Sequence, residues 1–125
     1  MRMWGLDPRI LCSRHLVGEH GELHLFIWCL VRHRRLEGYT TRGLMDIRLM
    51  VKRHRELADE MHHRGMAHNS KISDSDKVAI KEFIKSHPNT GFVDLQRNLY
   101  ALRERCAACR MRMDTVYPGK IRGKE

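Results

Sequence analysis

The fold should be built around residues 8–35, PRILCSRHLVGEHGELHLFIWCLVRHRR. Proline is tolerated in the first turn of a helix, and Gly38 lies just beyond the last charged residues, where a helix commonly ends. We therefore expect one long helix over residues 8–35, and its length makes it the central element of the fold. Its apolar face should consist of Leu16, Leu23, Ile27 and Leu30, which recur at helical spacing.

A polar stripe borders this apolar face. At about 100° per residue, His15, Glu19 and Glu22 fall within an arc of roughly 60°, so one imidazole and two carboxylates share a side of the helix. A partly desolvated carboxylate has a raised pKa, which suits a general acid or base. The amine at the start of the chain, beside Arg2, is the candidate nucleophile. The alternative is an ordinary solvated helical surface, which is the commoner meaning of such a stripe.

Two further helices have clear start or stop signals. Apolar residues at helical spacing predict a second long helix over residues 44–64, and Gly65 is its natural stop. Ser73 or Asp74 can cap a short third helix, which should end before Pro88 because the residue before proline disfavours helical geometry.

The carboxyl-terminal part of the chain predicts a fourth helix. It should begin after Asn89 or Thr90, and residues 115–125 should form a basic tail. The fold class is therefore all-α, with residues 1–125 forming a single compact domain in which the long amino-terminal helix packs with a second long helix and two further helices. The core-facing stripe of the fourth helix should contain Phe92, Leu95, Leu99, Leu102, Cys106 and Cys109.

Composition points to a polyanionic partner. The 125 residues include 24 Lys and Arg against 15 Asp and Glu, which gives a net charge of +9. This charge favours nucleic acid over an anionic membrane surface. No apolar run approaches the roughly 20 residues that a membrane span needs, and no signal peptide opens the chain, so we expect a cytoplasmic monomer. A phosphate-binding surface is expected from Arg32, Arg34, Arg35, Arg42, Lys52, Arg53 and Arg55.

The four cysteines raise the question of a metal site. Cys106 and Cys109 form half of a zinc-ribbon pattern, but a structural zinc site usually has four ligands. Cys12 and Cys29 would lie about 25 Å apart on one continuous helix, so both cannot reach the same ion. Because Cys106 and Cys109 also belong to the expected apolar stripe, we interpret them as packing residues, with a redox pair as the alternative. We expect no stoichiometric zinc.

The nine histidines offer a second possible metal site. His20 and His24 lie four residues apart on one helix face, as in metallohydrolases, but the flanking HExxH order is absent. His62, His63 and His68 are expected at an exposed helix end, where cations suit the helix dipole. A metal-dependent hydrolase is therefore the least favoured function.

Two segments resemble a known family. The first segment is RHLVGEHGELH, residues 14–24, which follows Met1 and Arg2 at a fixed distance. It resembles the amino terminus of the pyrimidine-dimer DNA glycosylases of the endonuclease V type. The stretch KRHRELADEMHHRGM, residues 52–66, is similar to the second long helix of that family. A weaker likeness to its basic aromatic carboxyl terminus lies between Tyr117 and Lys120. The resemblance implies an all-helical, metal-free glycosylase and abasic-site lyase that acts on double-stranded DNA without a small-molecule cofactor.

The resemblance also implies a mechanism. The terminal α-amine, here that of Met1, attacks the sugar C1′, displaces the damaged base and forms an imine that undergoes β-elimination. An α-amine has a pKa of about 7.7 to 8.0 against about 10.4 for lysine, so more of it is free base at neutral pH. Glu22 matches the essential carboxylate and His15 a histidine that lines the site. The resemblance implies DNA contacts at Arg2 and in the segment with Tyr117 and Lys120, and the basic residues add Arg14 and Arg42 as predicted DNA contacts.

The chain also departs from the family pattern. Gly21 and Leu25 stand where the best-known member carries DNA-contacting arginines. Arg14 lies on the same helix face and could replace one of them, while Gly18 and Gly21 would let the helix approach the duplex closely. The lesion is therefore left open between pyrimidine dimers and other damaged bases. A non-catalytic DNA-binding relative is the alternative function.

Overall fold

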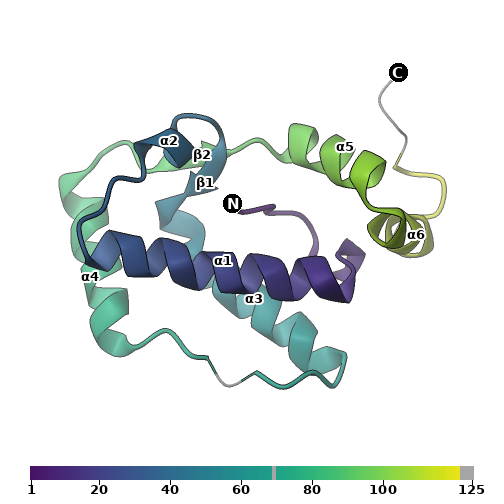
Figure 1. Cartoon of the computed structure of the whole chain (residues 1–125), viewed down its shortest axis with the longest axis horizontal. Helices are drawn as coiled ribbons and strands as arrows, with labels where there is room; N and C mark the ends of the chain where they lie inside the picture. The colour runs from purple at the N-terminus through teal and green to yellow at the C-terminus, as the bar shows by residue number, and fades with distance from the viewer. Residues whose placement is uncertain (69, 122–125) are drawn as a thin grey trace.

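The computed structural model describes residues 1–68 and 70–121, and these residues are mostly α-helical, as expected (Figure 1). Two short strands form an antiparallel pair, and two single-turn 3-10 helices precede longer helices. The elements are η1 (Pro8–Ile10), α1 (Ser13–Val31), α2 (Glu37–Thr40), β1 (Leu44–Asp46), η2 (Ile47–Leu49), α3 (Met50–His63), α4 (Asp74–Ser86), β2 (Gly91–Val93), α5 (Leu95–Arg105) and α6 (Ala107–Val116).

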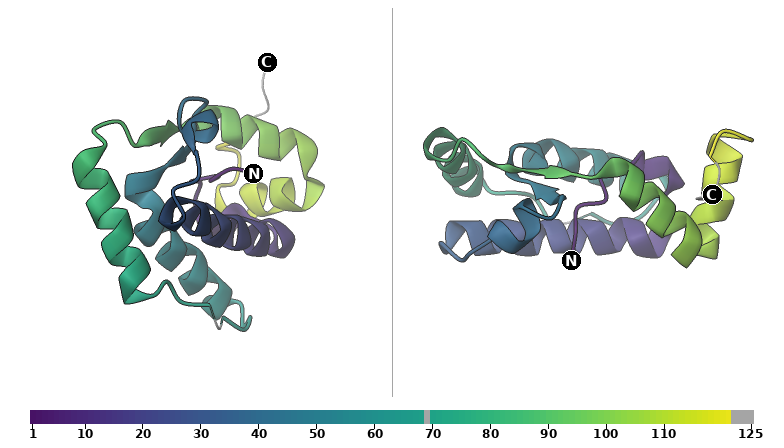
Figure 2. Two further views of the ribbon diagram at one scale, coloured as in Figure 1. Left: turned by 60° about the vertical axis from the view of Figure 1, so that its left-hand side comes forward. Right: turned by 90° about the horizontal axis from the view of Figure 1, so that it is seen from above.

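Helix α1 is the central element, as predicted. It crosses the middle of the molecule, with α3 packed against it, α4 at one side and the α5–α6 pair at the other (Figures 1 and 2). The expected apolar stripe is buried, and Phe26 joins it without measurable exposure. Helix α3 contributes Met50, Leu57 and Met61 to the same core. None of the helices that the structure describes has the length and apolar character that crossing a membrane requires.

The first helix is shorter than the predicted range of residues 8–35. Asp7 accepts a hydrogen bond from the Arg9 N–H and so caps η1, after which the backbone is extended at Leu11 and Cys12. Helix α1 begins only at Ser13 and ends at Val31, shortly before His33 adopts a left-handed φ of 56°. The prediction failed here because proline is compatible with a 3-10 turn as well as with an α-helix.

The second predicted helix, residues 44–64, also begins later than expected. Its first three residues form β1, in which Leu44 pairs with Val93 and Asp46 with Gly91 of β2. Asp46 then caps η2, and α3 runs from Met50 to His63. The stop at Gly65 is confirmed, since this residue has a left-handed φ of 74°. Strand pairing over such a sequence distance is not visible in helical periodicity.

The third helix matches its prediction and the fourth does not. Helix α4 is capped by Ser73, which accepts from the Asp76 N–H, and it ends before Pro88. The single helix expected through Cys109 is divided by an extended backbone at Cys106 into α5 and α6. Phe92 lies in β2 and is 52% exposed, and Leu95 is 50% exposed, so neither belongs to the core.

The expected basic tail begins later than residue 115, because α6 extends through Val116. Of this tail, residues 122–125 lie outside the described residues.

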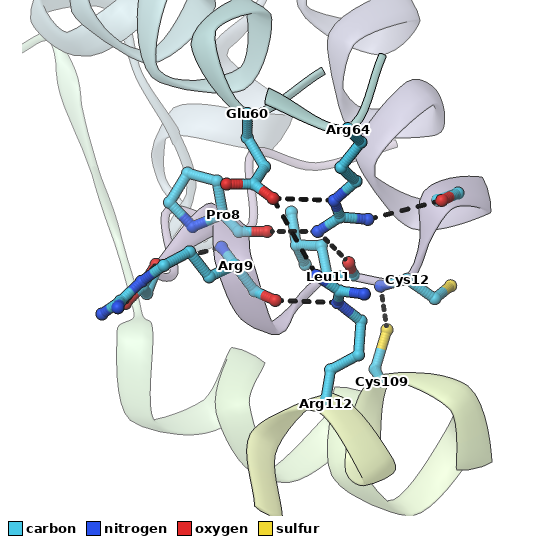
Figure 3. Close-up of polar contacts among 10 residues, drawn as sticks. Pro8, Arg9, Leu11, Cys12, Glu60, Arg64, Cys109 and Arg112 are labelled. Carbon is cyan, nitrogen blue, oxygen red and sulfur yellow. Dashed lines mark hydrogen bonds and ion pairs between the residues drawn. The ribbon is translucent and has the colours of Figure 1, made fainter. Parts of the chain in front are cut away.

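Two ion-paired arginines, one in α3 and one just after it, attach this part of the chain to the amino-terminal part. Arg53 binds both carboxylate oxygens of Glu19, at 2.6 and 2.8 Å, and donates to the carbonyl of Leu6. Glu19 therefore has a structural role and is separated from the polar stripe that the sequence predicted. A second pair is formed by Glu60 and Arg64, whose guanidinium also donates to the carbonyls of Pro8 and Leu11 (Figure 3).

Candidate active site at the amino terminus

The first residues of the chain are held in a fixed, extended position. The Met3 N–H donates to the carbonyl of Leu44 at 2.7 Å, and Met3 and Trp4 are both buried. The Asn98 side chain on α5, which is fully buried, donates to the carbonyls of Met3 and Trp4 at 3.2 and 3.0 Å. The chain therefore starts over the middle of α1 (Figure 1), and the view from above shows the segment running forward to end beside this helix (Figure 2).

This arrangement brings the start of the chain to Glu22. The backbone N–H of Arg2 donates to Oε2 of Glu22 at 3.2 Å. The α-amine of Met1 is only three covalent bonds from that nitrogen, so the amine lies within roughly 7 Å of the carboxylate. Met1 is 44% exposed and Glu22 is half-buried, which leaves the pair open to a substrate.

Arginines gather beside the amine. The Arg2 guanidinium donates to Oδ1 of Asn98 at 3.0 Å and lies 4.5 Å from the centre of the Trp4 ring. Burial lowers the pKa of Arg2, and the positive charges of Arg105 and Arg97 on α5 lower it further. Arginine nevertheless stays protonated in proteins, so all three guanidinium groups keep their positive charge. Guanidinium groups attract phosphate groups.

His15 lies at the edge of this site. Its ring makes an edge contact with Trp4, with 5.9 Å between ring centres. Burial lowers the pKa of His15, and Arg14 lowers it further while Glu22 opposes the shift. The charged form of the ring is therefore less favoured than in a free histidine. Its Nδ1 atom points at two sulfurs, 3.2 Å from Sγ of Cys12 and 3.5 Å from Sγ of Cys109.

The surface of α1 next to Glu22 is open. Arg14, Gly18 and Gly21 are exposed there, and Leu25 is 45% exposed. A methyl group added at either glycine would meet no other segment of the described chain within 4 Å. Another molecule can therefore approach the backbone of α1 closely along this side.

The other predicted DNA contacts, Arg42, Tyr117 and Lys120, lie in different places relative to the amine site. Arg42 is exposed before β1, and its carbonyl accepts from Arg97 at 2.8 Å, so it adjoins the arginine group. The Tyr117 hydroxyl donates to the carboxylate of Asp7, and its ring lies 5.6 Å from the Arg9 guanidinium, so this side chain joins the end of α6 to η1. Lys120 is exposed beyond α6. The contacts of the described residues do not join Tyr117 or Lys120 to Glu22.

Three side chains of this site were missed by the sequence analysis, and all are on α5. Asn98 positions the amino-terminal segment, while Arg97 and Arg105 supply charge beside Arg2. A signal existed for Asn98, because a polar residue among apolar residues at helical spacing is expected to have a specific buried partner. No signal in the sequence distinguishes Arg97 and Arg105 from solvated arginines.

A group of histidines lies on another side of α1. His20 Nε2 is 3.2 Å from Nε2 of His54 and 2.8 Å from Nε2 of His68, whereas His62 and His63 are exposed as expected. The expectation of an exposed His68 was therefore wrong. Burial, followed by the neighbouring histidines, lowers the pKa of His20 to about 4. Residues 20 and 22 are about 200° apart around a helix, so this group faces away from Glu22.

Comparison with known protein families identifies a relationship for the first part of the chain. The family model described as pyrimidine dimer DNA glycosylase matches residues 1–74, which include the amino-terminal segment, α1 and α3. Searches for similar curated proteins and for similar solved structures gave no match. The matched region contains Met1, Arg2 and Glu22 but ends before α5, which supplies Asn98 and two of the arginines.

Proposed function

The chain belongs to the pyrimidine dimer DNA glycosylase family, and we propose that it removes damaged pyrimidines from DNA and then cleaves the strand at the resulting abasic site. The observation that carries this proposal is the hydrogen bond from the Arg2 N–H to Glu22, which holds the start of the chain against a half-buried carboxylate. Nucleophile and acid/base partner are then preorganised before the substrate binds.

In the proposed reaction the free α-amine of Met1 attacks the sugar C1′. A bond forms between this nitrogen and C1′, the glycosidic bond breaks, and the damaged base leaves with the bonding electron pair. Loss of a proton from the nitrogen and opening of the sugar ring then give an imine. Glu22 stabilises the positive charge that develops at the sugar and carries protons during imine formation and β-elimination.

Arginine side chains provide the proposed DNA contacts near the amine. Arg2, Arg97 and Arg105 gather around the start of the chain, and Arg14 lies on the open face of α1 beside Gly18 and Gly21. The first three would bind the phosphates that flank the lesion. The two glycines would allow the duplex to approach α1 closely, and this approach would compensate for the arginine that the chain lacks at residue 21.

Borohydride trapping tests the chemistry. Reduction fixes an imine, so incubation with borohydride and DNA that contains an abasic site or a pyrimidine dimer should give a covalent complex, and peptide mapping should place the adduct on Met1. Acetylation of the α-amine, or an extension before Met1, should abolish trapping and strand cleavage while nonspecific DNA binding persists.

Two outcomes would contradict this mechanism. An adduct on a lysine would show that a different amine is the nucleophile. Complete absence of turnover on irradiated DNA, with binding retained, would instead support the alternative of a non-catalytic DNA-binding relative. The reason to consider this alternative is that Gly21 and Leu25 replace arginines of the family.

A further inference from the structure

Four side chains from opposite ends of the chain converge beside the candidate active site. Cys12 and His15 lie at the start of α1, and Cys106 and Cys109 lie at the start of α6. The sulfur atoms and one ring nitrogen of this Cys/His group all lie within 4.8 Å of one another. Cys106 and Cys109 are buried, Cys12 is 9% exposed, and all three cysteines are free thiols.

Three of the six separations between the ligand atoms are close to the edges of a metal-centred tetrahedron, and the others lie within 4.8 Å. With Zn–S bonds of about 2.3 Å and Zn–N bonds of about 2.0 to 2.1 Å, tetrahedral angles give edges of about 3.8 Å between sulfurs and about 3.5 Å between sulfur and nitrogen. The Cys12 and Cys106 sulfurs are 3.8 Å apart. The Nδ1 atom of His15 is 3.2 Å from the first of these sulfurs and 3.5 Å from that of Cys109.

Backbone N–H groups also point at the sulfurs. The His15 N–H donates to Sγ of Cys12 at 3.5 Å, and the Cys109 N–H donates to Sγ of Cys106 at 3.4 Å. Sγ of Cys109 accepts from the Cys12 N–H at 3.2 Å (Figure 3). Each sulfur therefore has a donor that stabilises a thiolate, the form in which cysteine binds metals.

Neither alternative interpretation of the cysteines accounts for this arrangement. Thiols that only fill space in a core need not point toward one another, yet three sulfurs and an imidazole nitrogen lie within 4.8 Å of one another here. A redox pair of Cys106 and Cys109 would use two of the sulfurs and leave the contacts of Cys12 with Cys106 and of His15 with Cys109 unexplained. The spacing is Cys-x-x-His on one helix start and Cys-x-x-Cys on the other, which matches paired ligands of structural zinc sites.

We propose that Cys12, His15, Cys106 and Cys109 bind one zinc ion in a closed structural site. The earlier expectation of no zinc considered Cys29 as the partner of Cys12, whereas the structure supplies His15 in its place. The ion would fasten the break between α5 and α6 to the start of α1. It would also fix His15 with Nδ1 on the metal and the proton on Nε2, and so hold the ring against Trp4 at the edge of the amine site.

Metal analysis of the protein purified under reducing conditions tests the proposal. Elemental analysis of the parent protein should find zinc. The zinc content of the double variant Cys106→Ser, Cys109→Ser should be lower by one zinc ion per chain. Cys29→Ser is the matched control, because Cys29 is a half-buried free cysteine on α1 outside the Cys/His group, and this variant should keep its zinc.

Cobalt substitution distinguishes this site from the histidine group around His20. Protein loaded with Co²⁺ should show a thiolate-to-metal charge-transfer band, which histidine ligands do not produce. The band should be present in the parent protein and in Cys29→Ser and absent from the double variant. If the parent protein has four reduced thiols but takes up neither Zn²⁺ nor Co²⁺ with thiolate absorption, the proposal is wrong.

Thiol titration of the parent protein avoids any dependence on the folding of a variant. With zinc bound, only Cys29 should react readily with a thiol reagent, and treatment with a strong chelator should expose the other three cysteines and lower the midpoint of thermal unfolding. Addition of Zn²⁺ should restore both properties. Unchanged thiol reactivity and unfolding midpoint after chelation would also overturn the proposal.

Discussion

The amine site around Glu22 and the Cys/His group around His15 are built from the same parts of the chain but have opposite character. At the amine site, α1 meets the amino-terminal segment and α5. At the Cys/His group, the start of α1 meets the start of α6. At the amine site Met1 is 44% exposed and Glu22 is half-buried, whereas Cys106 and Cys109 are at most 5% exposed. An open site can admit a substrate, while a closed set of four ligands leaves no position for one.

The two glutamates of α1 differ in the same way, in exposure and in the number of partners. Glu22 is held by a single hydrogen bond from the Arg2 backbone, whereas Glu19 is 1% exposed and bound at both oxygens by Arg53. We expect Glu22 to matter for turnover and Glu19 for stability.

Glu22→Gln should have the largest effect. Removal of the acid/base group should lower the rate of base release at least about 100-fold, while the free energy of unfolding and the affinity for undamaged duplex stay nearly unchanged because the side chains are almost isosteric. Single-turnover kinetics and thermal unfolding measure the two quantities. A variant with full activity would remove Glu22 from the mechanism.

Glu19→Gln should give the reverse result. It removes one charge of a buried ion pair and leaves Arg53 with only the half-exposed carboxylate of Glu56, 3.8 Å away, so the free energy of unfolding should fall by about 3 kcal/mol. Denaturant titration measures this loss. Glu82→Gln, which removes one partner of an exposed ion pair on α4, is the control and should change stability by less than about 1 kcal/mol.

Asn98→Ala should weaken both properties. The substitution leaves buried carbonyls of the amino-terminal segment without their donor, so we expect a loss of about 2 kcal/mol in the free energy of unfolding. Borohydride trapping should also become slower because Met1 is no longer held against Glu22. If trapping is unchanged at a temperature where the variant is folded, the segment does not need this anchor.

Stability should depend on pH through the histidine group. His20 has a pKa of about 4 in the folded protein against 6.5 as its ordinary value, so between these pH values the unfolded chain binds a proton that the folded chain does not. The free energy of unfolding should therefore fall as pH is lowered from about 6.5 to 4, by up to about 1.4 kcal/mol per pH unit for each such proton. His20→Gln should flatten this slope.

Arg14→Ala should have the smallest effect. The affinity for undamaged duplex should fall by about tenfold or less, and the dependence of log affinity on log salt should become shallower by about 0.9 if one phosphate contact is lost. Binding measured between about 50 and 200 mM salt gives both values. Lys81→Ala, an exposed cation on α4, should leave the salt dependence unchanged.

Helical periodicity and capping residues predicted the parts of the fold that depend on local sequence. The buried stripe of α1, the Ser73 cap of α4 and the stop at Gly65 all follow from residues within a few positions of one another. The same local rules extended the first helix back to Pro8 and joined α5 to α6 through Cys106, because neither break changes the apolar spacing.

Sequence patterns alone predict a mostly helical chain that resembles a family of DNA glycosylases, with His15 and Glu22 on one side of the central helix. Which of these groups meet follows from the tertiary structure. It bonded Glu19 to Arg53, brought Arg2 to Glu22 and Asn98, and joined Cys12 and His15 to cysteines more than 90 residues away. The physical reason is that helical spacing is a property of neighbouring residues, whereas these contacts depend on how separate helices pack.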